Sequence, residues 1–402
     1  LVYNWRAEAK KFAPDLRVLI HTGSNRTKNP ANFAIYDLIL TTYGIVRQDL
    51  EILKEFPFHY VVLDESQMIK NPESKTAKAV KQLLAQHRLS LTGTPLENSL
   101  MDLWSQMEFL NPGLLGTQRF FKDFYLQPIE KSQDKDRQTQ LKTLIHPFIL
   151  RRHKEQVAHE LPPKVEQRHF CEMTGEQKRI YEQTKNAYRN YLLNLDPGEF
   201  KSLRLGILAG LQKLRQIAIH PGLVEEGEGT ELRHSGKFQE FKRLLSEILA
   251  KGSKVLVFSQ FVRLLKLLEA DMQKEKISYA YLDGSTKDRQ SEVARFQEIE
   301  NVKVFLISLK AGGVGRNLTG AEYVFILDPW WNPAVEAQAV ARAHRIGQKN
   351  TVFSYKFITR DTIEEKIVRL QEKKSRLSNE IVSVEDDIFK SLNKDDFTEL
   401  LS

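Results

Sequence analysis

Val61-Val62-Leu63-Asp64-Glu65-Ser66-Gln67 is an apolar run that ends in two adjacent carboxylates. The β-branched run predicts a buried strand, and open α/β sheets bind their ligands at the carboxyl ends of strands. There Asp64 could hold Mg²⁺, and Glu65 could orient or deprotonate a water molecule that attacks a phosphate. The simpler interpretation is a strand-to-loop turn that carries two acids. The buried run before the acids and Gln67 after them favour the chemical interpretation.

Two further strands of this region end in hydroxyl groups. Thr41 and Thr42 follow one apolar run, and Thr92 and Thr94 follow another. Hydroxyls at a strand end can donate to the phosphates of a nucleic acid, and Thr92 and Thr94 could link a nucleotide site to a nucleic-acid strand. An ordinary strand-to-turn junction explains either pair alone, but the neighbouring acidic strand favours function.

Short apolar runs alternate with helical patterns, which predicts an α/β fold of parallel sheets covered on both faces. The expected strands are 16–20, 37–40, 60–64, 89–92, 254–259, 279–283, 302–308, 323–327 and 352–358, and the expected helices are 74–86, 260–273, 287–297, 334–344 and 362–377. They form two blocks, 1–110 and 235–375. Between the blocks, 118–220 is rich in Lys, Arg, Gln and Leu and is expected to be helical.

A glycine-rich loop ends a strand of the second block, in Ile307-Ser308-Leu309-Lys310-Ala311-Gly312-Gly313-Val314-Gly315. Its glycines let backbone N–H groups approach an anion closely. Lys310 and Asn317 are candidate contacts to sugar or phosphate, although the loop lacks the Gly-Lys-Ser/Thr ending of a γ-phosphate cradle. The next strand ends in Asp328-Pro329-Trp330-Trp331-Asn332-Pro333, whose tryptophans we expect to pack in a core or interface rather than against bases.

Residues 338–348 read Gln-Ala-Val-Ala-Arg-Ala-His-Arg-Ile-Gly-Gln. On a helix, Gln338, Arg342 and Arg345 are spaced so that all three point from one face. Two guanidiniums on one face suit a γ-phosphate whose charge grows during transfer. The alternative is a solvated basic helix face.

The composition narrows the class of protein. The 402 residues are 41% apolar, enough for two or three domains with real cores, and the net charge of +8 favours an acidic partner such as nucleic acid. A single cysteine, Cys171, rules out internal disulfides and fits a reducing compartment. No apolar run approaches the roughly 20 residues that cross a membrane, and the charged start is no signal peptide. We therefore expect a soluble intracellular protein.

The order of these segments resembles that of a superfamily-two helicase. Particular sequence motifs resemble those of the Swi/Snf family of double-stranded DNA translocases. These motifs are Leu91-Thr-Gly-Thr-Pro95 with Glu97-Asn98, Phe148-Ile-Leu-Arg-Arg152, Leu214-Arg-Gln216 with His220-Pro221, Asp328-Pro-Trp-Trp-Asn-Pro333 and Ala343-His-Arg-Ile-Gly-Gln348. The resemblance runs from Trp5 to about Leu377, nearly the whole chain.

The resemblance implies roles for particular residues. Asp64 and Glu65 match the Walker B acids for Mg²⁺ and water, and Gln67 stands where many eukaryotic members have His, which favours a bacterial source. Arg342 and Arg345 match arginine fingers that cross the lobe interface, and Gln338 shares their face. Further matches are Gly313 and Gly315 in a loop that couples nucleotide to DNA, Ser259 and Gln260 in a motif that grips a DNA strand, and Arg151 and Arg152 in a basic brace between lobes.

One departure from the family pattern is serious. The family's first lobe begins with a Gly-Lys-Thr phosphate loop, and no Gly-x4-Gly-Lys-Ser/Thr sequence occurs here; Gly236-Lys237, for example, is followed by Phe. Leu1-Val-Tyr-Asn-Trp5 resembles the family's next motif entered partway. We therefore expect a piece of a longer protein, with an open strand position in the first sheet.

The expected architecture is two RecA-like parallel-sheet lobes with helical insertions between them. The expected segments are a first lobe (1–117), a helical brace region (118–224), a glycine-bearing hinge (225–236), a second lobe (237–378) and an acidic tail (379–402). The implied activity is ATP- and Mg²⁺-dependent translocation on double-stranded DNA that remodels protein–DNA complexes, with a monomer in the bacterial nucleoid favoured, or in the nucleus of a eukaryote. The alternatives are a strand-separating helicase and an ATPase-dead DNA-binding module.

Overall fold

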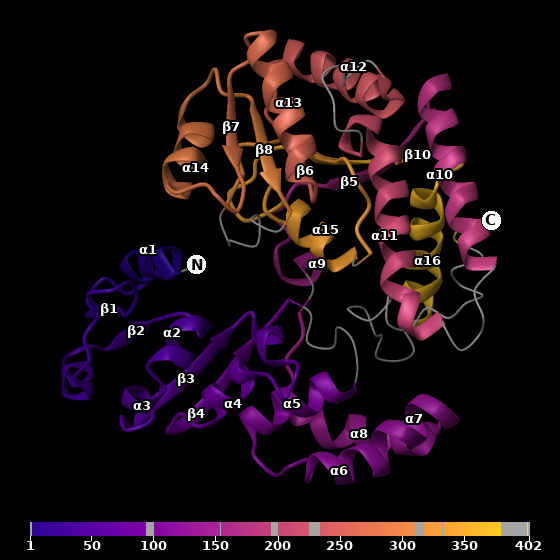
Figure 1. Cartoon of the computed structure of the whole chain (residues 1–402). Coiled ribbons are helices and arrows are strands. Elements are labelled where there is room, and N and C mark those ends of the chain that lie inside the picture. Colours follow the sequence, from indigo (N-terminus) through magenta and orange to yellow (C-terminus); the bar gives the residue numbers. More distant parts are fainter. Residues whose placement is uncertain are drawn as a thin grey trace. The chain divides into compact units, whose positions relative to one another are not determined.

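The computed structural model describes residues 2–93, 100–152, 154–193, 200–224, 234–309, 317–331, 333–378 and 400. The chain divides into two compact units, with residues 1–153 in unit 1 and residues 154–376 in unit 2 (Figure 1). Thr94, Lys310, Gly313 and Gly315 lie outside the described residues, as do most of the expected hinge and acidic tail. No described helix is long and apolar enough to cross a membrane.

Unit 1 contains two parallel strand pairs. β1 (Val18–Ile20) pairs with β2 (Leu38–Leu40), and β3 (Phe58–Asp64) pairs with β4 (Ala85–Leu91). Its helices are α1 (Val2–Phe12), η1 (Pro30–Ile35), α2 (Tyr43–Gln48), α3 (Leu50–Leu53), η2 (Ser66–Ile69), α4 (Lys75–Lys81), α5 (Leu100–Leu110), α6 (Gln118–Phe121), η3 (Lys122–Leu126), α7 (Gln127–Ser132), α8 (Lys135–Ile145) and η4 (His146–Phe148). The expected helix 74–86 is too long, because from Ala85 onward the backbone pairs with β3 instead.

The two strand pairs of unit 1 form separate sheets among the described residues. One face of β3–β4 packs on a core that includes Phe33, Ile69 and Val80. On β3 and β4, Tyr60, Val62 and Leu89 are about half exposed (56%, 48% and 45%). A parallel sheet is normally covered on both faces, so this sheet is incompletely covered by the described residues.

Unit 2 is built on one parallel six-stranded sheet of order β5-β10-β9-β6-β8-β7. The strands are β5 (Lys164–Cys171), β6 (Val255–Ser259), β7 (Tyr279–Leu282), β8 (Val304–Ser308), β9 (Tyr323–Ile326) and β10 (Val352–Thr359). The helices are α9 (Lys154–Val157), α10 (Gly175–Leu193), α11 (Phe200–Ile219), η5 (Pro221–Leu223), α12 (Gly236–Ala250), α13 (Val262–Lys274), α14 (Arg289–Glu298), α15 (Pro333–Val340) and α16 (Ile363–Ser378).

Successive residues of β6 enter different cores of unit 2. Val255 and Val257 pack with α12 and α13, whereas Leu256 and Phe258 pack with α14 and α15 on the opposite face. This two-sided burial explains why β6 reads as a continuous apolar run. Outside the sheet, α10, α11 and α16 lie side by side around a further core (Figure 1).

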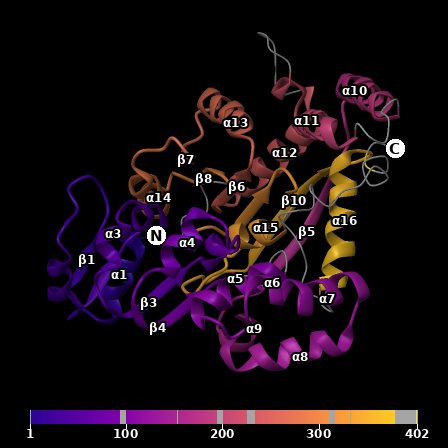
Figure 2. The ribbon, with the colours of Figure 1, turned by 60° about the horizontal axis from the view of Figure 1, so that its bottom comes forward.

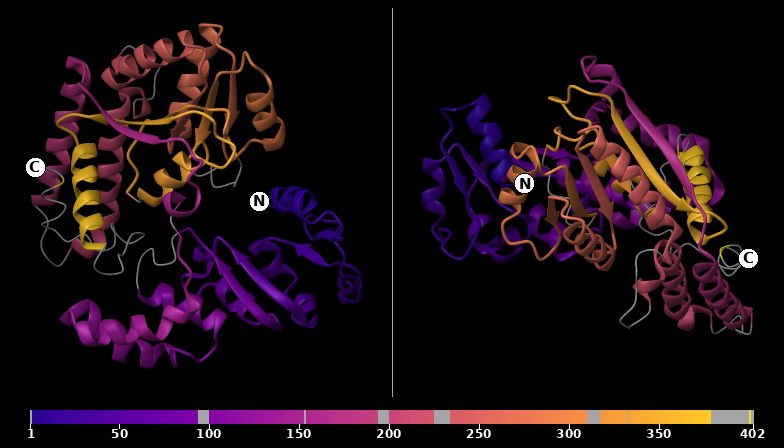
Figure 3. Two further views of the ribbon diagram at one scale, coloured as in Figure 1. Left: turned by 180° about the vertical axis from the view of Figure 1, so that it is seen from behind. Right: turned by 90° about the horizontal axis from the view of Figure 1, so that it is seen from above.

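One strand was not expected from the sequence. β5 lies inside the section expected to be helical, and it runs parallel to β10 at the edge of the sheet (Figures 2 and 3). Its sequence, Lys-Val-Glu-Gln-Arg-His-Phe-Cys, is largely polar and mostly exposed. An edge strand of this kind is specified by its eight-residue pairing with β10 more than by its own hydrophobic pattern.

Candidate functional site

The two acids that end β3 are held by hydrogen bonds. The Trp5 indole N–H donates to Asp64 Oδ2 (2.8 Å), and the Glu65 backbone N–H donates to Asp64 Oδ1 (2.9 Å). The Tyr43 hydroxyl donates to the Asp64 carbonyl (2.8 Å), and burial, reinforced by both carboxylates, raises the pKa of Tyr43 above its usual value. The sequence does not identify Trp5 or Tyr43 as site residues, because nothing in it links them to Asp64.

Glu65 has a left-handed backbone, with φ 50° and ψ 53°, where it leaves β3 and begins η2. Left-handed non-glycine residues are uncommon and concentrate at functional sites. Gln67 Nε2 donates to Glu65 Oε2 (2.7 Å), and the Thr92 hydroxyl donates to Gln67 Oε1 (3.1 Å). The structure thus brings together the acidic end of β3 and the hydroxyl end of β4, as the sequence predicts.

The threonines that end β2 help to build the local structure. The Thr41 hydroxyl donates to the His21 carbonyl (2.9 Å), and the Thr42 hydroxyl caps α2 by accepting from the Ile45 N–H (3.3 Å). Thr42 remains exposed. Arg151 and Arg152, between η4 and α9, are also exposed, and within the described residues neither forms a hydrogen bond or ion pair.

In unit 2, Ser259 and Gln260 lie beside Asp328, at the carboxyl ends of β6 and β9. The Gln260 N–H donates to Asp328 Oδ2 (3.1 Å), and the Ser259 hydroxyl accepts from the Phe261 N–H (3.0 Å). Burial raises the pKa of Asp328 to about 6. The hydrogen bond from Ser259 and the nearby charge of Arg215 act in the opposite direction and lower this pKa. Ser259 is fully buried in this structure, whereas Gln260 is only partly buried.

Arg215 of α11 is a buried cation whose role could not be read from the sequence. It is 2% exposed, and its Nη2 donates to the Pro329 carbonyl (2.8 Å). The guanidinium carbon lies 5.5 Å from the Trp330 ring centroid and 5.8 Å from that of Trp331. Burial lowers the pKa of Arg215. Trp331 is itself buried, which confirms that it packs in a core.

The expected single helix face for Gln338, Arg342 and Arg345 is a wrong prediction. Helix α15 ends at Val340, and only Gln338 lies on it. After Val340 the chain continues in tighter turns than an α-helix. The Arg342 N–H donates to the Ala339 carbonyl, three residues earlier, and the Arg345 N–H donates to the Ala343 carbonyl, two residues earlier. The Arg342 carbonyl also accepts from the Leu318 N–H (2.9 Å), which removes it from any helical ladder.

The two arginines have different surroundings. Arg342 is 8% exposed, whereas Arg345 is partly exposed and its Nη1 donates to Asn317 Oδ1 (2.9 Å). Asn317, which is expected to contact sugar or phosphate, orients Arg345 in this structure. An amide oxygen is a neutral partner that a more strongly charged acceptor can displace.

Lys154 is a further site residue that the sequence did not reveal. Its ammonium group donates to the His344 carbonyl (2.8 Å), and the His344 ring Nε2 lies 2.8 Å from the Pro162 carbonyl. Burial, with Arg345 and Lys164 nearby, lowers the pKa of Lys154. The segment around α9 therefore fixes the turn that carries Arg345.

Comparisons with known proteins give a consistent result. The SNF2-related domain matches residues 1–223, and the helicase conserved C-terminal domain matches residues 236–347. The putative ATP-dependent helicase/translocase YwqA of Bacillus subtilis is 39% identical over 95% of this chain and 42% of its own length. The TATA-binding protein-associated factor MOT1 of Saccharomyces cerevisiae is 34% identical over 95% of this chain and 24% of its own length.

A solved structure is also similar. The SWI2/SNF2 ATPase core domain of Sulfolobus solfataricus is 38% identical, with a TM-score of 0.51, over 99% of this chain and 81% of that one. The present chain thus spans less than half the length of the two curated relatives and most of the solved core.

Proposed function

The chain belongs to the SNF2-related family of ATP-dependent helicases and translocases, and from this premise we propose that it moves along double-stranded DNA and displaces proteins bound there. The observation that carries the proposal is the hydrogen-bonded chain from Glu65 through Gln67 to Thr92. It links a carboxylate suited to ATP hydrolysis with a second strand end. A change at the nucleotide can therefore be passed to residues that meet DNA.

In unit 1, Glu65 positions the water that attacks the γ-phosphate. Its left-handed backbone turns the chain from β3 into η2, and the Gln67 amide holds one carboxylate oxygen. A fixed carboxylate lowers the cost of orienting the water in the transition state. Gln67 contacts the nucleotide site and passes its state to Thr92.

Asp64 fits a magnesium ion. Mg²⁺ in nucleotide sites is held by one or two carboxylates together with phosphates and waters, and Asp64 supplies a carboxylate beside Glu65 at a strand end. When bound, the ion neutralises charge on the phosphates during transfer. Trp5 and the Glu65 N–H fix the Asp64 carboxylate before any ion arrives.

In unit 2, Arg342 and Arg345 stabilise the charge that develops on the γ-phosphate, as arginine fingers do. Asn317 holds Arg345 when ATP is absent and releases it to the more strongly charged phosphate. Gln338 and the loop of Gly313 and Gly315 contact the nucleotide. The proposed DNA contacts are Thr41, Thr42, Thr92, Thr94, Arg151, Arg152, Gln260 and Lys310.

The proposal is tested by displacement assays on the product of the complete gene. We expect duplex DNA to stimulate its ATP hydrolysis, and we expect it to displace the third strand of a triplex but not to separate a forked duplex. The 402-residue chain alone should hydrolyse ATP slowly, because it contains no Gly-x4-Gly-Lys-Ser/Thr loop.

Other outcomes would favour the alternatives. Fork separation would indicate a helicase, and DNA binding without hydrolysis by the complete product would indicate a binding module. Robust hydrolysis by the 402-residue chain that Glu65→Gln removes would contradict the expected dependence on a phosphate loop.

Duplex binding by the 402-residue chain should depend strongly on salt and weakly on sequence. The net charge of +8 and the exposed Arg151 and Arg152 favour contacts to the DNA backbone. For six or more phosphate contacts, affinity falls about a thousandfold between about 50 and 200 mM salt. Fluorescence anisotropy on unrelated duplexes at several salt concentrations measures this, and a flat response would rule out backbone-driven binding.

A further inference from the structure

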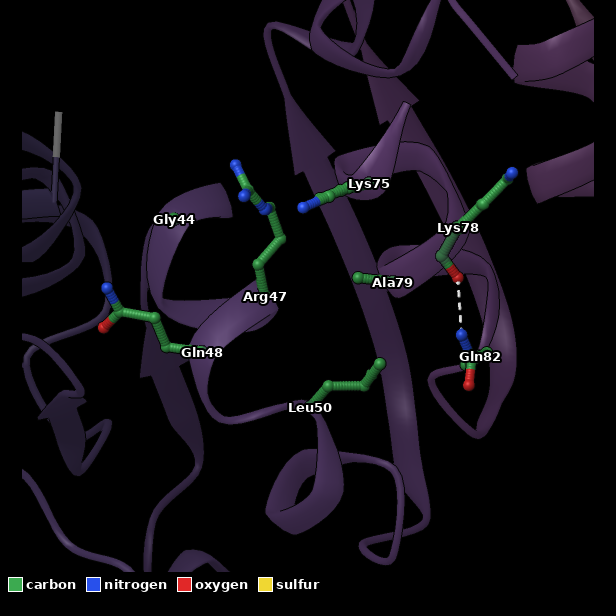
Figure 4. A pocket seen from close by; sticks show the side chains of 8 residues that line it. All are labelled: Gly44, Arg47, Gln48, Leu50, Lys75, Lys78, Ala79 and Gln82. Carbon is green, nitrogen blue, oxygen red and sulfur yellow. Dashed lines mark hydrogen bonds between the residues drawn. The ribbon is translucent and has the colours of Figure 1, made fainter. Parts of the chain in front are cut away.

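A basic pocket of about 410 Å³ opens between α2 and α4 in unit 1 (Figure 4). Its lining includes three cations, Arg47 from α2 and Lys75 and Lys78 from α4, and no carboxylate. Leu50 and Ala79 supply apolar surface between the two helices. None of these residues belongs to the strand-end site described above.

Two of the cations converge in this pocket, whose lining residues include no carboxylate. The Arg47 guanidinium and the Lys75 ammonium group point toward one another across the pocket (Figure 4). Lys78 pairs with Glu73 (2.7 Å), whereas among the described residues Arg47 and Lys75 form no hydrogen bond or ion pair. Like charges that face each other repel, and an anion placed between them turns that repulsion into two attractions.

The side chains that line the pocket favour a phosphate of a polymer over the phosphate of a free nucleotide. No aromatic side chain lines the pocket, so it offers no stacking surface for a free nucleotide's base. Arg47 lies on the helix that Thr42 caps, so the pocket continues the surface on which Thr41 and Thr42 are proposed to meet DNA. Arginine and lysine are the usual partners of backbone phosphates.

We propose that the Arg47–Lys75 pocket binds a backbone phosphate of the DNA. Neither residue belongs to the family motifs quoted in the sequence analysis. The inference rests on the proposed function, because it takes DNA as the ligand. It adds a second anchoring point in unit 1, carried by α2 and α4 rather than by the strand ends.

The test is a salt titration of duplex binding by the 402-residue chain, followed by fluorescence anisotropy without ATP. Arg47→Gln with Lys75→Gln should reduce the slope of log affinity against log salt by about two, one for each cation. The loss of affinity should then be about tenfold larger at about 50 mM than at about 200 mM salt. Both residues are exposed, so the variant should fold normally.

A matched control removes the same charge elsewhere in unit 1. Lys135→Gln with Lys142→Gln changes two exposed lysines of α8 and should leave the salt slope unchanged. Equal effects of the two double variants would overturn the inference and leave the proposed function standing. So would a loss of ATP binding, measured by equilibrium dialysis, with duplex binding unchanged. Absence of duplex binding by the unsubstituted chain would overturn the proposed function together with the inference.

Discussion

Arg345→Ala should lower DNA-stimulated ATP hydrolysis by the complete gene product about a thousandfold, the contribution that an arginine finger commonly makes. Its affinity for duplex DNA should change little. In this structure Arg345 donates one N–H to the neutral amide oxygen of Asn317, so the guanidinium is oriented, and it pairs with no carboxylate of the described residues. Its charge is therefore free to act on phosphate, and alanine removes that charge.

The fall should appear in kcat rather than in the KM for ATP, because the interaction strengthens as charge develops in the transition state. Arg345→Lys keeps the charge but loses the planar fork, so it should recover only part of the rate. Arg369→Ala, on the exposed side of α16, is the matched control and should turn over ATP normally. A rate loss in Arg345→Ala that follows a proportional loss of DNA binding would assign Arg345 to DNA instead.

Most of the strands in the three sheets could be predicted, because their own residues specify them. All nine expected strands are present, from β1 to β10 with β5 excepted. Apolar β-branched runs such as Val255–Phe258 are buried on both faces of a parallel sheet, which leaves a clear signal in the sequence. β5 leaves no such signal because one edge strand with polar side chains depends on its partner.

The candidate site was predictable only where strand ends determine it. Parallel strands bring their carboxyl ends to one edge, so the approach of Glu65 and Thr92 follows from the motifs. Pairings that depend on loop paths do not follow. Examples are the side-chain hydrogen bond from Arg345 to Asn317, the burial of Ser259 and the early end of α15. Each involves segments that are distant in the sequence, such as Leu318, whose N–H donates to the Arg342 carbonyl.

Lys237 shows the same limit in unit 2. Gly236-Lys237 resembles part of a phosphate loop, but the Lys237 side chain is 2% exposed and lies inside the fold. Its ammonium group donates to both oxygens of Glu364 (2.7 and 2.6 Å), and also to the carbonyls of Leu327 (2.9 Å) and Phe357 (3.3 Å). Glu364 in turn accepts from the Thr359 N–H (2.8 Å). The pair therefore joins α12 and α16 to the ends of β9 and β10.

Lys237→Met should destabilise unit 2 by about 3 to 5 kcal/mol, because it leaves the Glu364 carboxylate buried without a countercharge. For a unit of this size the midpoint of thermal unfolding should fall by about 10 °C. Lys237→Met with Glu364→Met should recover more than half of the loss, since an apolar pair of similar volume removes the isolated charge.

An exposed ion pair of the same unit provides the control for Lys237→Met. Lys164→Met breaks the pair with Glu166, whose side chains are 38% and 60% exposed, and should cost less than about 1 kcal/mol. Calorimetry of the unsubstituted chain and of the three variants distinguishes the possible causes of the lost stability. If Lys237→Met were as mild as Lys164→Met, water or a shifted proton would already compensate Glu364. If the double variant were no more stable than the single one, the cost would lie in lost hydrogen bonds to the Leu327 and Phe357 carbonyls rather than in the unpaired carboxylate.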